Sequence, residues 1–294
     1  MVSILRLFCD VDDFCKEFEP RWKQRLLNDG KRKRIKKSKL SLSEVMTIAI
    51  LFHSSQYRTF KHYYISHVMI NLRRAFPELV SYNRFVELMA SALSPLCCYL
   101  QTRKGNVTDI SFVDSTPIAV CHNRRIHSHK VLKELSQRGK TSMGWFYGFK
   151  LHIIINEHGD LLAFKVTPGN IDDRTPVPDM VKNMSGKLFG DKGYISQKLF
   201  EKLMKQGVQL ITKMKKNMKN KLMPLFDAIL LRKRALIETV NDQLKNISQI
   251  EHTRHRSIVN FVVNLIAGLI AYTWQPKKPS LDIKNQTNGS LVIV

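Results

Sequence analysis

The chain has 294 residues, 44% of them hydrophobic, and its formal net charge at pH 7 is +24. That length suits one large domain plus a smaller one, and the hydrophobic fraction excludes a chain too polar to build a core. The charge says little about the fold, but it predicts a polyanionic partner, either nucleic acid or an anionic surface.

Particular segments argue against a disulfide-bonded, a secreted or a membrane-spanning protein. The five cysteines show no Cys-x-x-Cys pair and no zinc-ligand spacing, so we expect free thiols in a reducing compartment. No signal peptide is expected, because acids follow Met1–Phe8 at once. The longest apolar run, Ile258–Tyr272, is shorter than the about 20 residues that span a membrane, and it contains Asn260 and Asn264. It predicts a buried helix, and we expect no membrane partner.

The first segments of the chain have a helical texture. Residues 1–30 look helical and carry an acidic patch, and the next nine positions hold seven cations. Charge this dense is drawn to phosphates, so we expect this basic segment, 31–39, to add salt-sensitive affinity for DNA. A helix follows over Val45–Phe52, with Ser41 or Ser43 as its N-cap. The cations expected to bind DNA are Lys31, Arg32, Lys33, Arg34, Lys36 and Lys37.

Residues 56–100 continue as short helices rich in aromatic and cationic side chains. Pro77 interrupts them, and another helix begins at Ser81 and runs through Leu93. A helix, a short turn and a second helix with Tyr82, Asn83 and Arg84 at its N-terminus are typical of a helix-turn-helix reader of DNA. A small helical bundle with cationic edges would give the same pattern. With Gln101–Asn106 as a linker, residues 1–106 are expected to form a helical DNA-binding region.

From Val107 onward the residue pattern predicts strands separated by helices. The polar basic loop 121–143 lies between the first two strands, and its cations, including Arg124 and Arg125, favour a phosphate channel over a histidine metal site. A second basic run, Lys213–Lys221, contains Lys215 and Lys216, which we also expect to contact DNA. Strands are predicted over Ile110–Val120, Trp145–Ile155, Leu161–Thr167, Lys187–Gly190 and Val208–Thr212, and helices over Val177–Met184, Ser196–Gln206, 227–249 and Arg256–Trp274.

The order of these elements predicts the fold of the second region. Three strands in an antiparallel meander followed by crossovers describe an RNase H-like fold, a mixed five-stranded sheet with flanking helices. The fold class is therefore α+β, with an N-terminal all-α region followed by an RNase H-like catalytic domain over 107–274. The polar tail 275–294 is expected to be disordered.

Two acids fall where such a fold builds its site. Asp191 stands between Gly190 and Gly193 at a strand end, where an ordinary turn is the alternative interpretation. Asp114 stands in the first strand, which lies beside the fourth in this fold, so the two carboxylates can approach each other. Two divalent ions about 3.5–4 Å apart need such carboxylates for in-line attack at phosphorus. Oxygen ligands suit Mg²⁺ or Mn²⁺ better than zinc.

A third acid is expected from the helix at 227–249. Glu238 shares one face of this helix with Arg234 and Lys245, beside a separate apolar stripe. An exposed Arg234–Glu238 pair without function is the alternative, and Glu201, Asp242 and Glu251 remain open as the third carboxylate. The stripe expected to pack on the sheet consists of Ile237, Val240, Leu244 and Ile247.

The chain resembles the IS982-family insertion-sequence transposases over nearly its whole length. The residues that carry the resemblance are Phe112–Pro117, Gly148–His152, Thr167–Asp173, Gly190–Tyr194 and Ile237–Thr239. The resemblance implies a DDE transposase of a bacterial mobile element, with catalytic acids at Asp114, Asp191 and Glu238. Arg234, Glu238 and Lys245 also match the related pattern Y-x2-R-x3-E-x6-K, whose tyrosine position is Leu231 here.

These observations together predict a DNA transposase that uses two Mg²⁺ or Mn²⁺ ions. Asp114, Asp191 and Glu238 are expected to hold the ions, and Arg234 and Lys245 to contact DNA phosphates near the cut. The expected partners are double-stranded DNA, as terminal inverted repeats and target, and further copies of the chain in a homodimer or higher multimer. The expected location is the bacterial cytoplasm, at the nucleoid. A nuclease that cuts without joining and a non-enzymatic DNA-binding protein are the alternatives.

Overall fold

The structure is a computed structural model that describes residues 3–30, 38–213, 222–251, 255–281 and 291–293. The expected DNA contacts Lys31, Arg32, Lys33, Arg34, Lys36, Lys37, Lys215 and Lys216 lie outside the described residues. The chain divides into two compact units, and each contains two stretches of sequence. The first consists of Met1–Arg103 and Gln243–Pro276, and the second of Lys104–Asp242 and Lys277–Val294.

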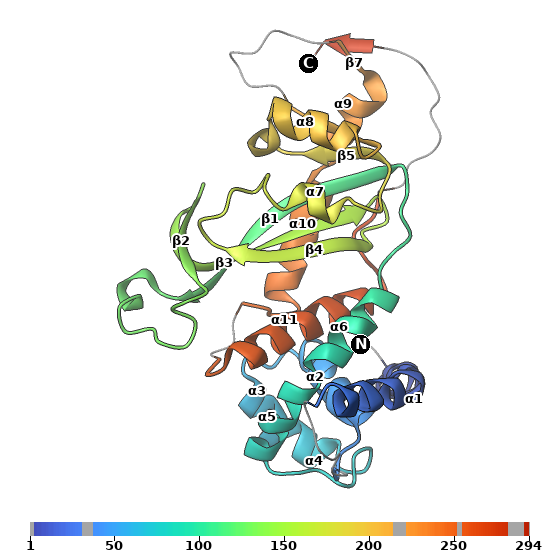
Figure 1. Cartoon of the computed structure of the whole chain (residues 1–294), viewed down its shortest axis with the longest axis vertical. Helices are drawn as coiled ribbons and strands as arrows, with labels where there is room; N and C mark the ends of the chain where they lie inside the picture. Colours follow the sequence, from blue (N-terminus) through green and yellow to red (C-terminus); the bar gives the residue numbers. More distant parts are fainter. Residues whose placement is uncertain (1–2, 31–37, 214–221, 252–254, 282–290, 294) are drawn as a thin grey trace. The chain divides into compact units, whose positions relative to one another are not determined.

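The described part of the first unit is helical (Figure 1). Ser41 is the N-cap of α2, because its hydroxyl accepts from the Glu44 N–H while Glu44 accepts from the Ser41 N–H. Ser43 instead donates to Asp12 of α1 at 2.7 Å. The helices are α1 (Ile4–Asn28), α2 (Leu42–Phe52), α3 (Phe60–Tyr63), the π-helical turn η1 (Tyr64–Val68), α4 (Met69–Asn71), α5 (Tyr82–Ser91), α6 (Leu93–Thr102) and α11 (Ile258–Thr273).

The connection before α5 is longer than a helix-turn-helix allows. Residues 72–81 separate α4 from α5, whereas that motif joins its helices by a turn of about three or four residues. The ring of Tyr82 is half-buried against Phe60 and Tyr64. The first unit is therefore a helical bundle, the alternative that the sequence left open.

Helix α11 is part of this bundle, although the sequence placed it with the strands. Twelve of its residues are buried, and it packs against α2, α5 and α6. His53, at the end of α2, contacts the backbone oxygen of Ser248, and a Cβ at Gly268 would lie 2.4 Å from Ile250. The first unit therefore needs residues from both ends of the chain to close its core.

This composition predicts how a truncated chain behaves. A fragment ending at Asn106 lacks α11 and exposes the apolar faces of α2 and α6, so we expect it to be unfolded or aggregated. Burial of Leu, Ile or Phe contributes about 1.5–3 kcal/mol per side chain, and α11 supplies many such side chains. Circular dichroism and thermal melting check this. Joining residues 1–103 to 243–276 through a flexible linker should restore a cooperative melt, and a well-folded 1–106 fragment would contradict the assignment.

The second unit is built on a six-stranded mixed sheet, one strand more than expected. Strand β1 pairs antiparallel with β3 and parallel with β5, and β5 pairs parallel with β6. Strands β2 and β4 pair in succession along the other edge of β3. The strands are β1 (Ile110–Cys121), β2 (Gln137–Thr141), β3 (Gly144–Asn156), β4 (Leu161–Pro168), β5 (Gly186–Gly190) and β6 (Val208–Thr212).

The order β4-β3-β1-β5-β6 is that of an RNase H-like fold, which confirms the expectation. Strand β2 is the addition, and it forms inside the segment expected to be a basic loop. The apolar side chains Val113, Ile154 and Leu188 of the sheet pack with those of the helices that cover it, Val177 and Leu199 among them. The helices and turns are α7 (Val177–Met180), α8 (Gln197–Met204), α9 (Leu225–Arg232), η2 (Asn123–Arg125) and η3 (Lys192–Tyr194).

The helix expected over 227–249 is divided in two. Helix α9 ends at Arg232, and α10 (Ala235–Asn246) begins after Arg234. The boundary between the units falls inside α10, after Asp242. Ile237, Val240 and Leu244 are buried as expected, but Ile247 is 52% exposed because it follows the last residue of the helix.

The described part of the 275–294 tail has defined partners in the second unit. Lys278 forms an ion pair with Asp160 at 2.6 Å, and the Leu281 N–H donates to the Glu157 carbonyl. Residues Leu291–Ile293 form β8, which pairs with β7 (Leu222–Pro224). The remaining tail residues, 282–290 and 294, lie outside the described part.

Candidate active site

Asp114 lies in β1, level with Asp191, which directly follows the adjacent strand β5. Strands β1 and β5 run parallel, and Phe112 pairs with Phe189 in their register. Asp114 and Asp191 each stand two residues beyond that pair, at the carboxyl end of β5, where parallel sheets build their sites. The sheet therefore brings these two sequence-predicted acids together.

The glycines around Asp191 fix how its carboxylate lies. Asp191 is the N-cap of η3, and its Oδ1 accepts from the Gly193 N–H at 2.8 Å. A Cβ at Gly193 would lie 3.0 Å from that oxygen, and a Cβ at Gly190 would lie 3.1 Å from the Tyr194 ring. Both positions are therefore tight, and the motif Gly190–Tyr194 packs a buried tyrosine beneath an oriented acid.

Asp114 is held in an environment that disfavours its charge. Burial raises its pKa to about 6, although the guanidinium of Arg234 and a backbone hydrogen bond act in the opposite direction. The nearby carboxylates of Asp191 and Glu238 raise the pKa of Asp114 further. A positive charge placed among these acids would lower the pKa of Asp114 again, because an opposite charge favours the ionised carboxylate.

Arg234, which precedes α10, and Asn241 of α10 contact the Asp114 carboxylate. Arg234 Nη1 lies 3.7 Å from Asp114 Oδ1, and Arg234 Nη2 hydrogen-bonds to Glu238. The Arg234 side chain is 19% exposed and that of Glu238 is 56% exposed. Asn241 Nδ2 donates to Asp114 Oδ2 at 3.0 Å. Arg234 thus stands between two of the predicted acids rather than on a solvent-facing stripe.

Lys245 has a different setting from the one expected. It belongs to the first unit, where its ammonium lies 3.2 Å from the carboxylate of Glu251. Both side chains are 22% exposed. Lys245 therefore has an acidic partner within its own unit, and Glu251, one of the alternatives for the third acid, serves as that partner.

Several residues that sequence reasoning did not single out lie near the acids. Lys150, which is buried, donates to the Ile171 carbonyl and to Asp173 at 2.9 Å each. Asp114, Asp173 and Asp191 all raise the pKa of the buried Tyr194 hydroxyl, after the larger effect of burial. Lys150 and Asp173 occupy motifs that carry the family resemblance, and that was the only signal available for them. Asn241 had no signal beyond its place near the Glu238 face.

The donor atoms at this site fit a divalent cation. Asn241 Oδ1 is buried beside Asp114 and has no hydrogen-bond partner among the described residues. With the carboxylates of Asp114, Asp191 and Glu238 it makes an all-oxygen donor set, which Mg²⁺ and Mn²⁺ prefer. Among the described residues these acids do not form a compact three-ligand cluster, and Arg234 lies between Asp114 and Glu238.

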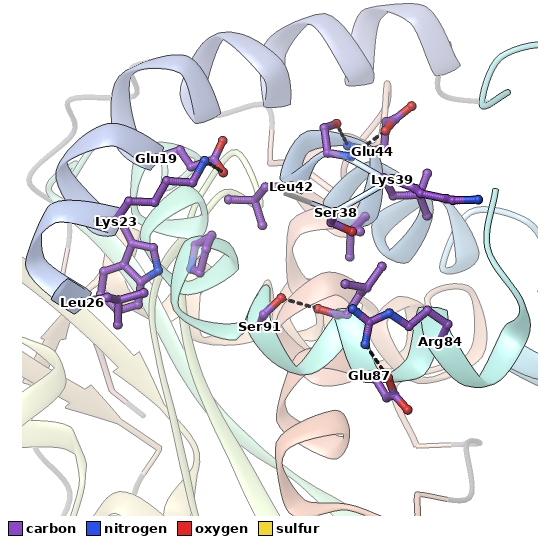
Figure 2. A pocket seen from close by; sticks show the side chains of 16 residues that line it. Glu19, Lys23, Leu26, Ser38, Lys39, Leu42, Glu44, Arg84, Glu87 and Ser91 are labelled. Carbon is purple, nitrogen blue, oxygen red and sulfur yellow. Dashed lines mark hydrogen bonds and ion pairs between the residues drawn. The ribbon is translucent and has the colours of Figure 1, made fainter. Parts of the chain in front are cut away.

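Arg84, one of the candidate DNA contacts of the first unit, borders a cavity of about 810 Å³ (Figure 2). Asn83 and Arg84 are exposed at the start of α5, and Arg84 pairs with Glu87 at 2.6 Å. Three cations and three acids line the cavity, so it lacks the excess of positive charge that a phosphate site needs. The charged lining residues are Lys23, Lys39, Arg84, Glu19, Glu44 and Glu87.

Arg124 and Arg125 lie in η2, directly after β1, and both are exposed. Asn123 of the same turn donates to the Trp145 carbonyl at 2.7 Å, which attaches η2 to the start of β3.

Among the described residues, no helix has the length and apolar character needed to cross a membrane.

Comparison with known proteins adds four findings. A family model for the transposase DDE domain matches residues 104–258, more than half of the chain. The chain is distantly similar to a piggyBac transposase in a synaptic complex with hairpin DNA, at 8% identity and a TM-score of 0.46, covering 93% of this chain and 75% of that one. It is also distantly similar to the Mos1 mariner paired end complex with Mn, at 12% identity and a TM-score of 0.25, covering 87% and 84%. No curated protein matches.

Proposed function

Because the chain belongs to the family of transposase DDE domains, we propose that it is a DNA transposase that hydrolyses phosphodiester bonds at the ends of a mobile element. One observation carries this proposal. Asp114 in β1 is level with Asp191 at the end of the parallel strand β5, and both Asp191 and Glu238 act electrostatically on Asp114. The net charge of +24 suits a DNA substrate.

We extend the proposal to the kind of element and to the second reaction. The motif residues Phe112–Pro117 and Gly190–Tyr194 favour a bacterial insertion sequence of the IS982 type. After hydrolysis, the freed 3′-OH would attack target DNA at the same site, with no covalent enzyme intermediate. Terminal inverted repeats and target DNA would be the partners, bound by a homodimer or higher multimer at the nucleoid.

Each residue of the site has a role in this scheme. Asp114, Asp191 and Glu238 would hold the divalent ions, and Asn241 Oδ1 offers a further oxygen. Ions bound there would activate the attacking water or hydroxyl and stabilise charge at the phosphate. Arg234 links Asp114 to Glu238, and its charge beside these acids would help to neutralise a phosphate near the cut.

The test uses the purified full-length protein and a labelled duplex that carries the terminal repeat flanking its gene. We expect strand cleavage in Mg²⁺ or Mn²⁺ and none in EDTA, followed by joining of the cut 3′ end to a plasmid. Cleavage without joining would identify a nuclease of the same fold. Specific binding to the repeat without cleavage would identify a non-enzymatic DNA-binding protein.

A further inference from the structure

The hairpin of β2 and β3 exposes a tryptophan at the edge of the sheet. Trp145 is 53% exposed and is the one exposed aromatic side chain in the described chain. Met143, at the tip of the same hairpin, is 96% exposed. Strand β2 is the first strand in the sheet order, so no further strand pairs with its outer edge (Figure 1).

Two cations lie over the indole ring of Trp145. Lys140 pairs with Trp145 in the register of the hairpin, and Arg138 lies on the same face because it is two residues away on β2. The Arg138 guanidinium carbon is 5.0 Å from the ring centroid, and the Lys140 nitrogen is 5.7 Å from it. The other face of the hairpin is packed, since a Cβ at Gly139 would lie 2.2 Å from the Gly169 carbonyl oxygen.

The exposure of Trp145 is not imposed by its position on the sheet. Tyr147 lies on the same face two residues further along β3, yet it is buried. The loop after β1 covers Tyr147, with the His129 ring 6.3 Å away and the Lys133 carbonyl accepting from its hydroxyl. The same loop reaches the backbone of Trp145 through Asn123, while the Trp145 side chain stays exposed.

The surroundings of this ring are strongly cationic. Residues 122–145 contain six lysines and arginines and one acid, Glu134. Within the described chain none of the six forms an ion pair, so their charges are available to a ligand. An aromatic face beside unpaired cations is the arrangement with which proteins bind single-stranded nucleic acid. The six are Arg124, Arg125, Lys130, Lys133, Arg138 and Lys140.

We propose that Trp145 is a stacking site for an unpaired DNA base, and that Arg138 and Lys140 bind the phosphates beside that base. This rests on the proposed function only in taking DNA as the ligand. An edge strand can also carry cations simply to prevent pairing with another sheet, but that purpose needs no exposed tryptophan. Opening of the duplex near the cut would supply such a base.

Binding by the full-length protein in EDTA tests this without any cleavage. The probes are a fluorescent duplex with one unpaired thymine and the same duplex fully paired. We expect the wild type to prefer the unpaired probe by about 5- to 150-fold, the range expected for stacking one base. W145A and W145L should lose this preference, and W145F should keep most of it. The matched control is M204A, which removes an exposed apolar side chain between Lys202 and Lys205 on α8 and should change nothing.

A second measurement observes the ring itself. W22F/W274F leaves Trp145 as the sole tryptophan, and we expect its fluorescence to be quenched more by the unpaired probe than by the paired one. Retention of the preference by both W145A and W145L would overturn the proposal, as would an equal loss of affinity for both probes. Cleavage without a Trp145-dependent preference would refute this inference alone. A Trp145-dependent preference without cleavage would refute only the proposed function.

Discussion

Replacing Asp191 by asparagine is expected to lower DNA cleavage by about a thousandfold or more and to leave DNA binding intact or tighter. Ions at such a site contribute several kcal/mol to the transition state, and about 4 kcal/mol corresponds to a thousandfold change in rate. The fold should survive, because an asparagine oxygen can still accept from the Gly193 N–H as Asp191 does. Binding should survive because affinity for DNA comes from cations elsewhere.

Cleavage of an end-labelled duplex and fluorescence anisotropy check the two parts of this result. D114A and E238A should behave in the same way. The control is D179N, which changes an exposed aspartate of the second unit that pairs with Lys165 and Lys182. Vigorous Mg²⁺-dependent cutting by D191N would remove Asp191 from the site, and the same result for E238A would return Glu201 and Asp242 to consideration.

The second large effect is expected for Arg234→Gln, in stability as well as in activity. Arg234 lowers the pKa of Asp114, so its removal raises a pKa that burial already places at about 6. A carboxyl group whose pKa is raised by folding loses stability as the pH rises from its unfolded value through its folded one. At pH 5 Asp114 is largely protonated in both proteins, and their difference is small. At pH 8 the variant must keep an ionised, uncompensated Asp114, which costs about 1–3 kcal/mol.

Thermal melting in EDTA at the two pH values measures this difference. We expect R234Q to lower the melting temperature clearly at pH 8 and little at pH 5, and to slow cleavage by about 10- to 100-fold, or about 1.4–2.7 kcal/mol. R234K should recover part of the melting temperature at pH 8 and part of the cleavage rate. R232Q, at the exposed end of α9, should alter neither of these two quantities. An equal loss of melting temperature at both pH values would mean that Arg234 acts by packing alone.

The strand arrangement was predictable because it depends on the local pattern of apolar and polar residues and on the order in which the strands are connected. Alternating and continuous apolar runs marked β1, β3, β4, β5 and β6, and crossovers between the later strands required parallel pairing. The proximity of Asp114 to Asp191 followed from that order. Strand β2 was missed because its sequence, Gln137–Thr141, is polar and lies in a cationic segment.

Side-chain partnerships between distant elements were not predictable. Asn241 and Asp114 are 127 residues apart, and no spacing rule connects them. The helical wheel placed Arg234 beside Glu238 but could not show that Arg234 also faces Asp114. Helix α11 was assigned to the wrong neighbours because apolar residues reveal burial and not the partner that buries them.

The division of the first unit between the two ends of the chain has a consequence during protein synthesis. The ribosome releases residues 1–103 well before residues 243–276 that complete their core. At about 5–20 residues per second, roughly 10 to 30 seconds separate Arg103 from the start of α11. Throughout that interval α2 and α6 have no α11 to cover the apolar faces that pack against it in the complete unit. The helical unit is therefore completed only after all six strands of the sheet in the second unit have been synthesised.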